Sequence, residues 1–98
     1  MRAAEAQLHQ LLQTNNLTAG MYVRVRGDHL IVGRQEPTGP AGAIEDNDRV
    51  RFTRLHPGRY GVSVKRHTGR WEQTPFHGSM QDGVDAVCSF MQHLVAPY

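Results

Sequence analysis

Apolar residues recur at helical spacing near both ends of the chain. Near the N-terminus they predict one face of a helix over residues 3–15, with Ala4, Leu8, Leu11 and Leu12 at the i, i+4, i+7 and i+8 positions. Near the C-terminus, Ser79 is a natural N-cap, and Asp82 resembles its partner in a capping box. The apolar stripe of this second predicted helix consists of Met80, Val84, Val87, Cys88, Met91, Leu94 and Val95. Pro97 ends the pattern.

Between the two helices the apolar period changes to two, which is typical of half-buried strands. Turn signals such as Gly27-Asp28 and Thr68-Gly69 separate the alternating segments. The predicted strands cover residues 21–26, 29–32, 49–53, 60–65 and 70–76.

The order of these elements predicts the fold class. No helix is predicted between two strands, so the crossover connections of a parallel sheet are excluded. We expect a single small α+β domain over residues 1–98, with a largely antiparallel sheet of about five strands. The N-terminal and C-terminal helices should pack on one face of this sheet and leave the other face to solvent.

The segment 36–48 differs in composition from the strands on either side of it. It contains two prolines, two glycines and four of the chain's nine acidic residues, with no Lys or Arg. This composition predicts a loop that lies over an edge of the sheet. Two arrangements are open: the acidic loop covers the basic residues that follow it, or it leaves them to a partner.

A basic block is the clearest electrostatic feature, although the net charge is only +2. Residues 49–70 contain seven Lys or Arg residues and no acid. Strand alternation places five cations on the solvent face, out of phase with the apolar positions, and these are the candidate anion-binding or partner-binding residues: Arg24, Arg26, Arg49, Arg51 and Lys65. Such a concentration of positive charge favours an anionic partner, which could be nucleic acid, an acidic protein or the chain's own acidic segment.

Aromatic residues on the same face would favour nucleic acid, because single-strand binders that use a sheet stack bases on aromatic rings. The pattern predicts only Tyr22 on the solvent face, and it predicts Phe52, Tyr60 and Trp71 in the core.

No catalytic, cofactor-binding or metal-binding signature is present in the sequence. Nucleophile elbows, phosphate-binding loops, dinucleotide-binding glycine motifs and the zinc-protease motif are all missing. The six histidines do not occur at the spacing of metal ligands, and the single cysteine, Cys88, falls on an apolar stripe where a thiol is inert. We therefore expect no cofactor and no metal. The longest apolar stretches fall far short of the roughly 20 residues that span a bilayer. No signal-peptide pattern begins the chain, so we expect a cytoplasmic location and no membrane partner.

These observations favour a non-enzymatic binding or interaction module. The first hypothesis is that it acts on another protein, or on itself as a homodimer, through a sheet edge or the exposed sheet face. The alternative is an electrostatic nucleic-acid binder that uses the Arg-rich face. A third hypothesis is a small enzyme whose site leaves no pattern in the sequence.

Overall fold

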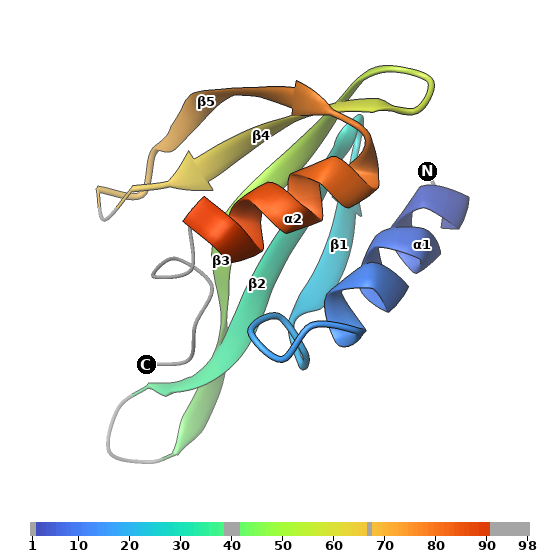
Figure 1. Cartoon of the computed structure of the whole chain (residues 1–98). Helices are drawn as coiled ribbons and strands as arrows, with labels where there is room; N and C mark the ends of the chain where they lie inside the picture. Colours follow the sequence, from blue (N-terminus) through green and yellow to red (C-terminus); the bar gives the residue numbers. More distant parts are fainter. Residues whose placement is uncertain (1, 39–41, 67, 91–98) are drawn as a thin grey trace.

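The computed structural model describes residues 2–38, 42–66 and 68–90, and it shows a five-stranded sheet with a helix at each end of the chain (Figure 1). In chain order the elements are α1 (Arg2–Gln13), β1 (Tyr22–Arg26), β2 (His29–Thr38), β3 (Ala43–His56), β4 (Arg59–Lys65), β5 (Trp71–Gly78) and α2 (Met80–Phe90). The predicted α+β fold is therefore confirmed. Within the described ranges, neither helix is long and apolar enough to cross a membrane.

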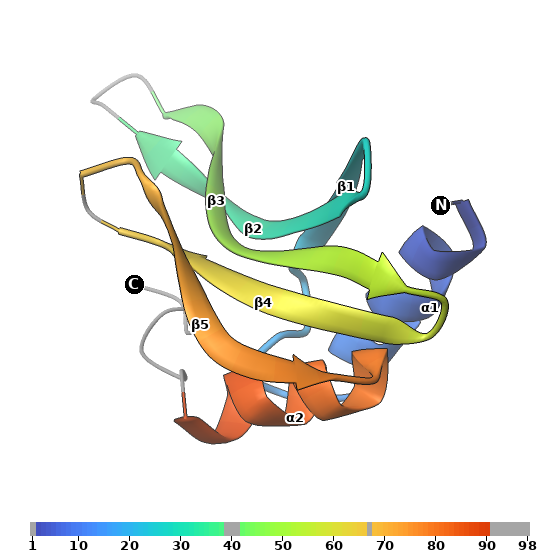
Figure 2. The ribbon, with the colours of Figure 1, turned by 90° about the horizontal axis from the view of Figure 1, so that it is seen from above.

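Neighbouring strands are all antiparallel, and their spatial order, β1-β2-β3-β4-β5, is also their order in the sequence. Both helices lie on the same side of this twisted sheet, with α1 beside β1 and α2 along β4 and β5 (Figures 1 and 2). The edges of the sheet are β1 and β5.

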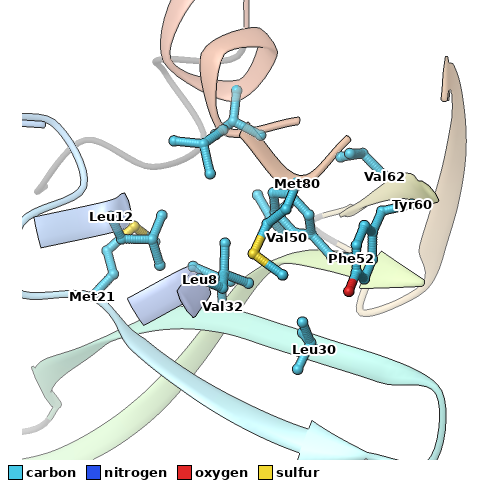
Figure 3. Packing of buried hydrophobic residues seen from close by; sticks show 12 residues of the cluster. Leu8, Leu12, Met21, Leu30, Val32, Val50, Phe52, Tyr60, Val62 and Met80 are labelled. Carbon is cyan, nitrogen blue, oxygen red and sulfur yellow. The ribbon is translucent and has the colours of Figure 1, made fainter. Parts of the chain in front are cut away.

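Apolar side chains fill the space between the sheet and the helices (Figure 3). The buried cluster consists of Leu8, Leu12, Met21, Leu30, Val32, Val50, Phe52, Tyr60, Val62, Met80, Val84 and Val87. Its helical members belong to the two stripes that the sequence predicts. The Phe52 ring lies so close to α2 that a Cβ on Gly83 would sit 2.6 Å from its Cε2 atom. The helix thus approaches β3 through a position that has no side chain.

The predicted capping box is present at the start of α2. The backbone N–H of Asp82 donates to Oγ of Ser79 at 3.1 Å, and the backbone N–H of Ser79 donates to Oδ2 of Asp82 at 3.4 Å. These bonds satisfy two backbone donors at the beginning of the helix. The last three members of the predicted stripe (Met91, Leu94 and Val95) and Pro97 lie outside the described residues.

The prediction of a loop over residues 36–48 was wrong for most of the segment. Residues 36–38 continue β2 and residues 43–48 continue β3, and the two extensions pair from Gly33↔Asp48 to Thr38↔Ala43. Among the residues that the structure describes, neither extension has a second neighbouring strand, because β1 pairs with β2 only as far as Gly33 and β4 pairs with β3 only as far as Val50. Pro37 is tolerated because a strand in a two-stranded ribbon leaves one side free of ladder bonds.

Candidate functional site

The side of the sheet away from the helices is crossed by a row of five residues in register. Arg24 on β1 pairs with Ile31, which pairs with Arg51 on β3, and the row continues through Ser63 to Gln73 on β5. We call this side the open face, and its members are Tyr22, Arg24, Arg26, His29, Ile31, Gly33, Asp48, Arg51, Thr53, Gly61, Ser63, Lys65, Trp71 and Gln73.

Four of the five predicted cations belong to the open face. Arg24 and Arg51 lie in the central row on strands β1 and β3, which β2 separates. Arg26 pairs with His29 at the end of β1, and Lys65 pairs with Trp71 at the end of β4. The strand order, which alternation alone does not define, places these cations on β1, β3 and β4.

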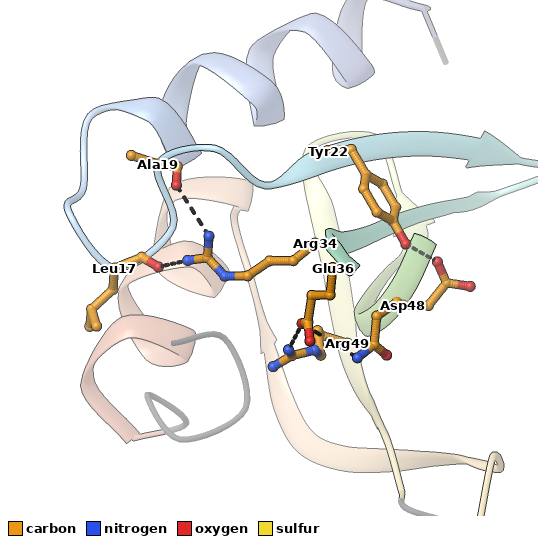
Figure 4. Close-up of polar contacts among 8 residues, drawn as sticks. Leu17, Ala19, Tyr22, Arg34, Glu36, Asp48 and Arg49 are labelled. Carbon is orange, nitrogen blue, oxygen red and sulfur yellow. Dashed lines mark hydrogen bonds and ion pairs between the residues drawn. The ribbon is translucent and has the colours of Figure 1, made fainter. Parts of the chain in front are cut away.

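Arg49 is the exception, and its predicted place on the open face was wrong. Val32 pairs with Val50 but Gly33 pairs with Asp48, so Arg49 is an extra residue of β3 at a β-bulge. The bulge reverses the alternation, and Arg49 is only 5% exposed, in an ion pair with Glu36 (Figure 4).

Acidic side chains of the β2–β3 extension occupy one end of the open face. The guanidinium of Arg24 forms an ion pair with Asp48 at 2.8 Å and a longer one with Asp46 at 3.7 Å. Tyr22 donates its hydroxyl proton to the same Asp48 carboxylate (Figure 4). Burial, followed by this hydrogen bond, raises the pKa of Tyr22 above its usual value, so the phenol stays protonated. The acidic segment therefore neutralises Arg24 and Arg49.

The β5 side of the open face combines an aromatic ring with two cations. Trp71 on β5 lies beside its strand partner Lys65, whose Nζ is 5.9 Å from the ring centroid. Cζ of Arg51 lies 4.9 Å from the same centroid. In the described ranges, no acidic side chain forms an ion pair with Arg51 or Lys65. This cluster of Arg51, Lys65 and Trp71 remains positive because the acidic segment neutralises residues elsewhere.

The prediction that Trp71 faces the core was therefore wrong. Phe76 on the same strand packs against the core cluster, whereas Trp71 is five residues earlier and lies on the other face. Counting back in steps of two from Phe76 would have placed Trp71 on the open face. The large apolar area of tryptophan favoured the opposite interpretation. Phe52 and Tyr60 are buried in the core, as predicted.

A pocket of about 330 Å³ opens beside this cluster, across β2 to β5. Its lining consists of His29, Arg51, Thr53, Leu55, Gly61, Ser63, Trp71 and Gln73. Gly61 and Ser63 are buried and small, and they form a low floor between larger side chains. The volume is at the lower end of the range of small-molecule sites, about 300–1,000 Å³.

The pocket contains several polar groups that can form hydrogen bonds. Nδ1 of His29 lies 2.9 Å from Oγ1 of Thr53. Burial and, after it, the neighbouring Arg51 charge lower the pKa of His29, which favours the neutral imidazole at pH 7. Nε of Arg51 is buried and has no hydrogen-bond partner among the residues that the structure describes.

A second hollow of about 730 Å³ lies between β5 and α2, on the helix side of the sheet. Its lining includes Phe76, Ala86 and Phe90, and Phe90 is 82% exposed. Two acids, Asp82 and Asp85, border it. This hollow is mainly apolar and acidic, so its chemistry differs from that of the basic open face.

The described residues include no group of three or more His, Cys, Asp and Glu side chains that could hold a metal ion. Cys88 is half-buried on α2, and burial raises the pKa of its thiol, which disfavours the reactive thiolate.

No protein-family model, curated protein or solved structure matches this chain. The function is therefore inferred from the geometry and chemistry of the open face.

Proposed function

We propose that this protein is a non-enzymatic binding protein that holds single-stranded nucleic acid on the open face of its sheet. The observation that supports the proposal is the position of Trp71, which lies on the open face with Cζ of Arg51 4.9 Å and Nζ of Lys65 5.9 Å from its ring centroid. Bases stack on aromatic rings and on guanidinium planes, while cations neutralise the phosphates that connect the bases. One cluster thus supplies both kinds of contact.

The charge distribution of the open face supports the same proposal. Arg24 already has two carboxylate partners, whereas Arg51 and Lys65 have ring contacts with Trp71 and no ion pair with any described acid. A cation that lacks an internal partner remains available to a phosphate. We expect the nucleic-acid strand to cross β3, β4 and β5 and to avoid the acidic residues beside β1.

A single strand fits this surface better than a duplex. Base pairs in a duplex stack on one another, so a ring on a sheet surface has no base face to contact. We therefore expect weak, salt-dependent binding to duplex DNA and tighter binding to single strands.

Strand addition at a sheet edge remains the other prediction, for a protein partner or for a homodimer. Pro75 on β5 has no N–H, so this edge offers one donor fewer to an added strand. A single species of monomer mass in sedimentation at high protein concentration would contradict the homodimer.

Titration of labelled single-stranded and duplex oligonucleotides by fluorescence anisotropy, at low and high salt, tests the proposal. Trp71 is the only tryptophan of the chain, so a bound base should also change its intrinsic fluorescence. The logarithm of affinity should fall with the logarithm of salt concentration, with a slope of about −0.7 for each phosphate contact.

Charge reversal of the cluster provides the variants. Arg51→Glu and Lys65→Glu should each weaken binding and reduce the salt slope. Arg2→Glu is the matched control, because Arg2 is an exposed residue of α1, which packs on the other side of the sheet. The proposal fails when no oligonucleotide binds at low salt, or when both cluster variants bind as well as the control does.

A further inference from the structure

The pocket beside Trp71 has the size and the chemistry of a site for one nucleotide. It combines a depression, a cation and an aromatic ring on the open face. Its other polar members, Thr53, Ser63 and Gln73, supply hydroxyl and amide groups that can donate and accept hydrogen bonds. Such groups recognise the edge of a base, whereas an electrostatic track along phosphates does not need them.

We propose that this pocket takes one nucleotide of the bound strand, with the base inside the pocket and its phosphate on Arg51. This inference rests on the proposed function, because it assigns one position of the strand to one place on the open face. The ligand class is a nucleobase that carries a phosphate, and a phosphate alone lacks the group that the pocket walls contact.

Arg51 connects the two parts of this ligand. Its guanidinium lies over the Trp71 ring, which limits the orientations that its donors can take. Its Nε–H is buried and has no partner in the described part of the chain, so the terminal N–H groups of the same guanidinium are the donors that we assign to a phosphate oxygen at the pocket rim. The Trp71 ring and the Arg51 guanidinium are both planar groups on which a base can stack.

The floor of the pocket explains how a base can enter. A Cβ added to Gly61 would meet Cδ1 of Leu55 at 3.5 Å, which is an ordinary van der Waals contact, and it would not meet backbone at shorter range. A Cβ at Gly61 therefore fits, and we expect the methyl groups of a valine, which suits a strand, to fill space that a base needs. A substitution at Gly61 therefore changes the shape of the pocket and leaves the charges around it unchanged.

The experiment titrates nucleoside 5′-monophosphates, ribose 5-phosphate and inorganic phosphate against the protein, with Trp71 fluorescence as the signal. We expect saturable quenching by at least one nucleotide and none by the two compounds that lack a base. Gly61→Val should weaken nucleotide binding by roughly tenfold or more, which is the effect of losing one stacked base. Thermal unfolding measures whether the variant is folded.

A second variant tests the pocket if Gly61→Val does not fold. Gln73→Ala removes an exposed amide at the pocket wall, and Gln81→Ala removes the same amide from the surface of α2 as the matched control. We expect Gln73→Ala to weaken nucleotide binding and Gln81→Ala to leave it unchanged.

The outcomes separate this inference from the proposed function. Oligonucleotide binding without nucleotide binding, and without an effect of Gly61→Val on oligonucleotides, overturns the pocket and leaves the proposed function intact. Nucleotide binding without oligonucleotide binding supports the pocket and overturns the proposed function. Equal quenching by ribose 5-phosphate and by nucleotides shows a phosphate site without base recognition, which overturns the inference. When neither ligand binds, both proposals are wrong.

Discussion

Arg51 lies over the ring of Trp71, with its Cζ atom 4.9 Å from the ring centroid, although β4 separates the strands of the two residues. The contact spans two strand spacings, about 10 Å in a typical sheet, which the two long side chains bridge over the small Ser63. The contact therefore depends on the arrangement of three strands and not on one strand pairing.

This contact should be measurable as a coupling energy. A double-mutant cycle with Arg51→Ala and Trp71→Ala should give about 0.5–1 kcal/mol in the free energy of unfolding, as partly exposed cation–π pairs do. Urea unfolding of the four proteins measures it. The same cycle with Arg59→Ala, on an exposed residue at the start of β4, is the control and should give a coupling near zero. Equal couplings in the two cycles would contradict a specific Arg51–Trp71 contact.

Acidic residues at the end of the open face should weaken nucleic-acid binding. Asp46 is exposed and lies 3.7 Å from Arg24, so Asp46→Asn removes a negative charge from that end and frees part of Arg24. We expect about two- to threefold tighter binding of single strands at low salt, and no difference at high salt, where exposed charges are screened. Asp85→Asn makes the same change on α2 and should have no effect. Anisotropy titrations of both variants would reject the idea if Asp46→Asn bound no better than Asp85→Asn.

His29 should make stability depend on pH in a defined direction. Burial and the Arg51 charge lower the pKa of His29 in the folded state below its usual 6.5, so the unfolded chain binds the proton more readily. The contribution of neutral His29 to the free energy of unfolding is fully present above about pH 6.5. It is lost as the pH falls through the folded-state pKa. His29→Gln should therefore reduce the drop in melting temperature between pH 7.5 and pH 5, and thermal unfolding at both values measures this. His9→Gln, on the exposed surface of α1, is the control. A drop of the same size in the wild type and in His29→Gln would contradict the prediction.

Glycine should be required at position 83 because the Phe52 ring packs closely against it, and not because α2 needs a glycine to form. Alanine is about 1 kcal/mol better than glycine in a helix, so an isolated helix would gain stability from Gly83→Ala. In the folded protein, the new Cβ would sit 2.6 Å from Cε2 of Phe52, which forces the ring or the helix to move. We expect a net loss of about 1–3 kcal/mol in the free energy of unfolding, measured in urea. Gln81→Ala, on the exposed side of the same helix, should change it by less than about 0.5 kcal/mol. A more stable Gly83→Ala variant would show that α2 does not pack as closely as described.

The sequence predicted those features that depend on local pattern. Helical stripes such as the one through Leu8 and Leu12, and the capping pair Ser79 and Asp82, were confirmed because each involves residues within one or two turns. Alternation predicted the number of strands, and the connections between them predicted an antiparallel sheet. These features do not depend on which strands are neighbours in the sheet.

The candidate site depended on information that a local pattern does not contain. Alternation assigns a residue to a face only while the strand is regular, and the bulge at Arg49 reversed it. Hydrophobicity suggested a core position for Trp71, although its strand partner Lys65 and the core residue Phe76 place it on the open face.

The sequence by itself therefore determined the α+β class, the two helices and the positive charge of the middle strands. These follow from short-range periodicity and from composition, which act along the chain. The tertiary structure decided that the acidic segment extends β2 and β3 and neutralises Arg24 and Arg49, and that Arg51 and Lys65 meet at Trp71. Those contacts come from strand register and from side chains that reach across several strands, and register is settled only when the whole sheet packs against its helices.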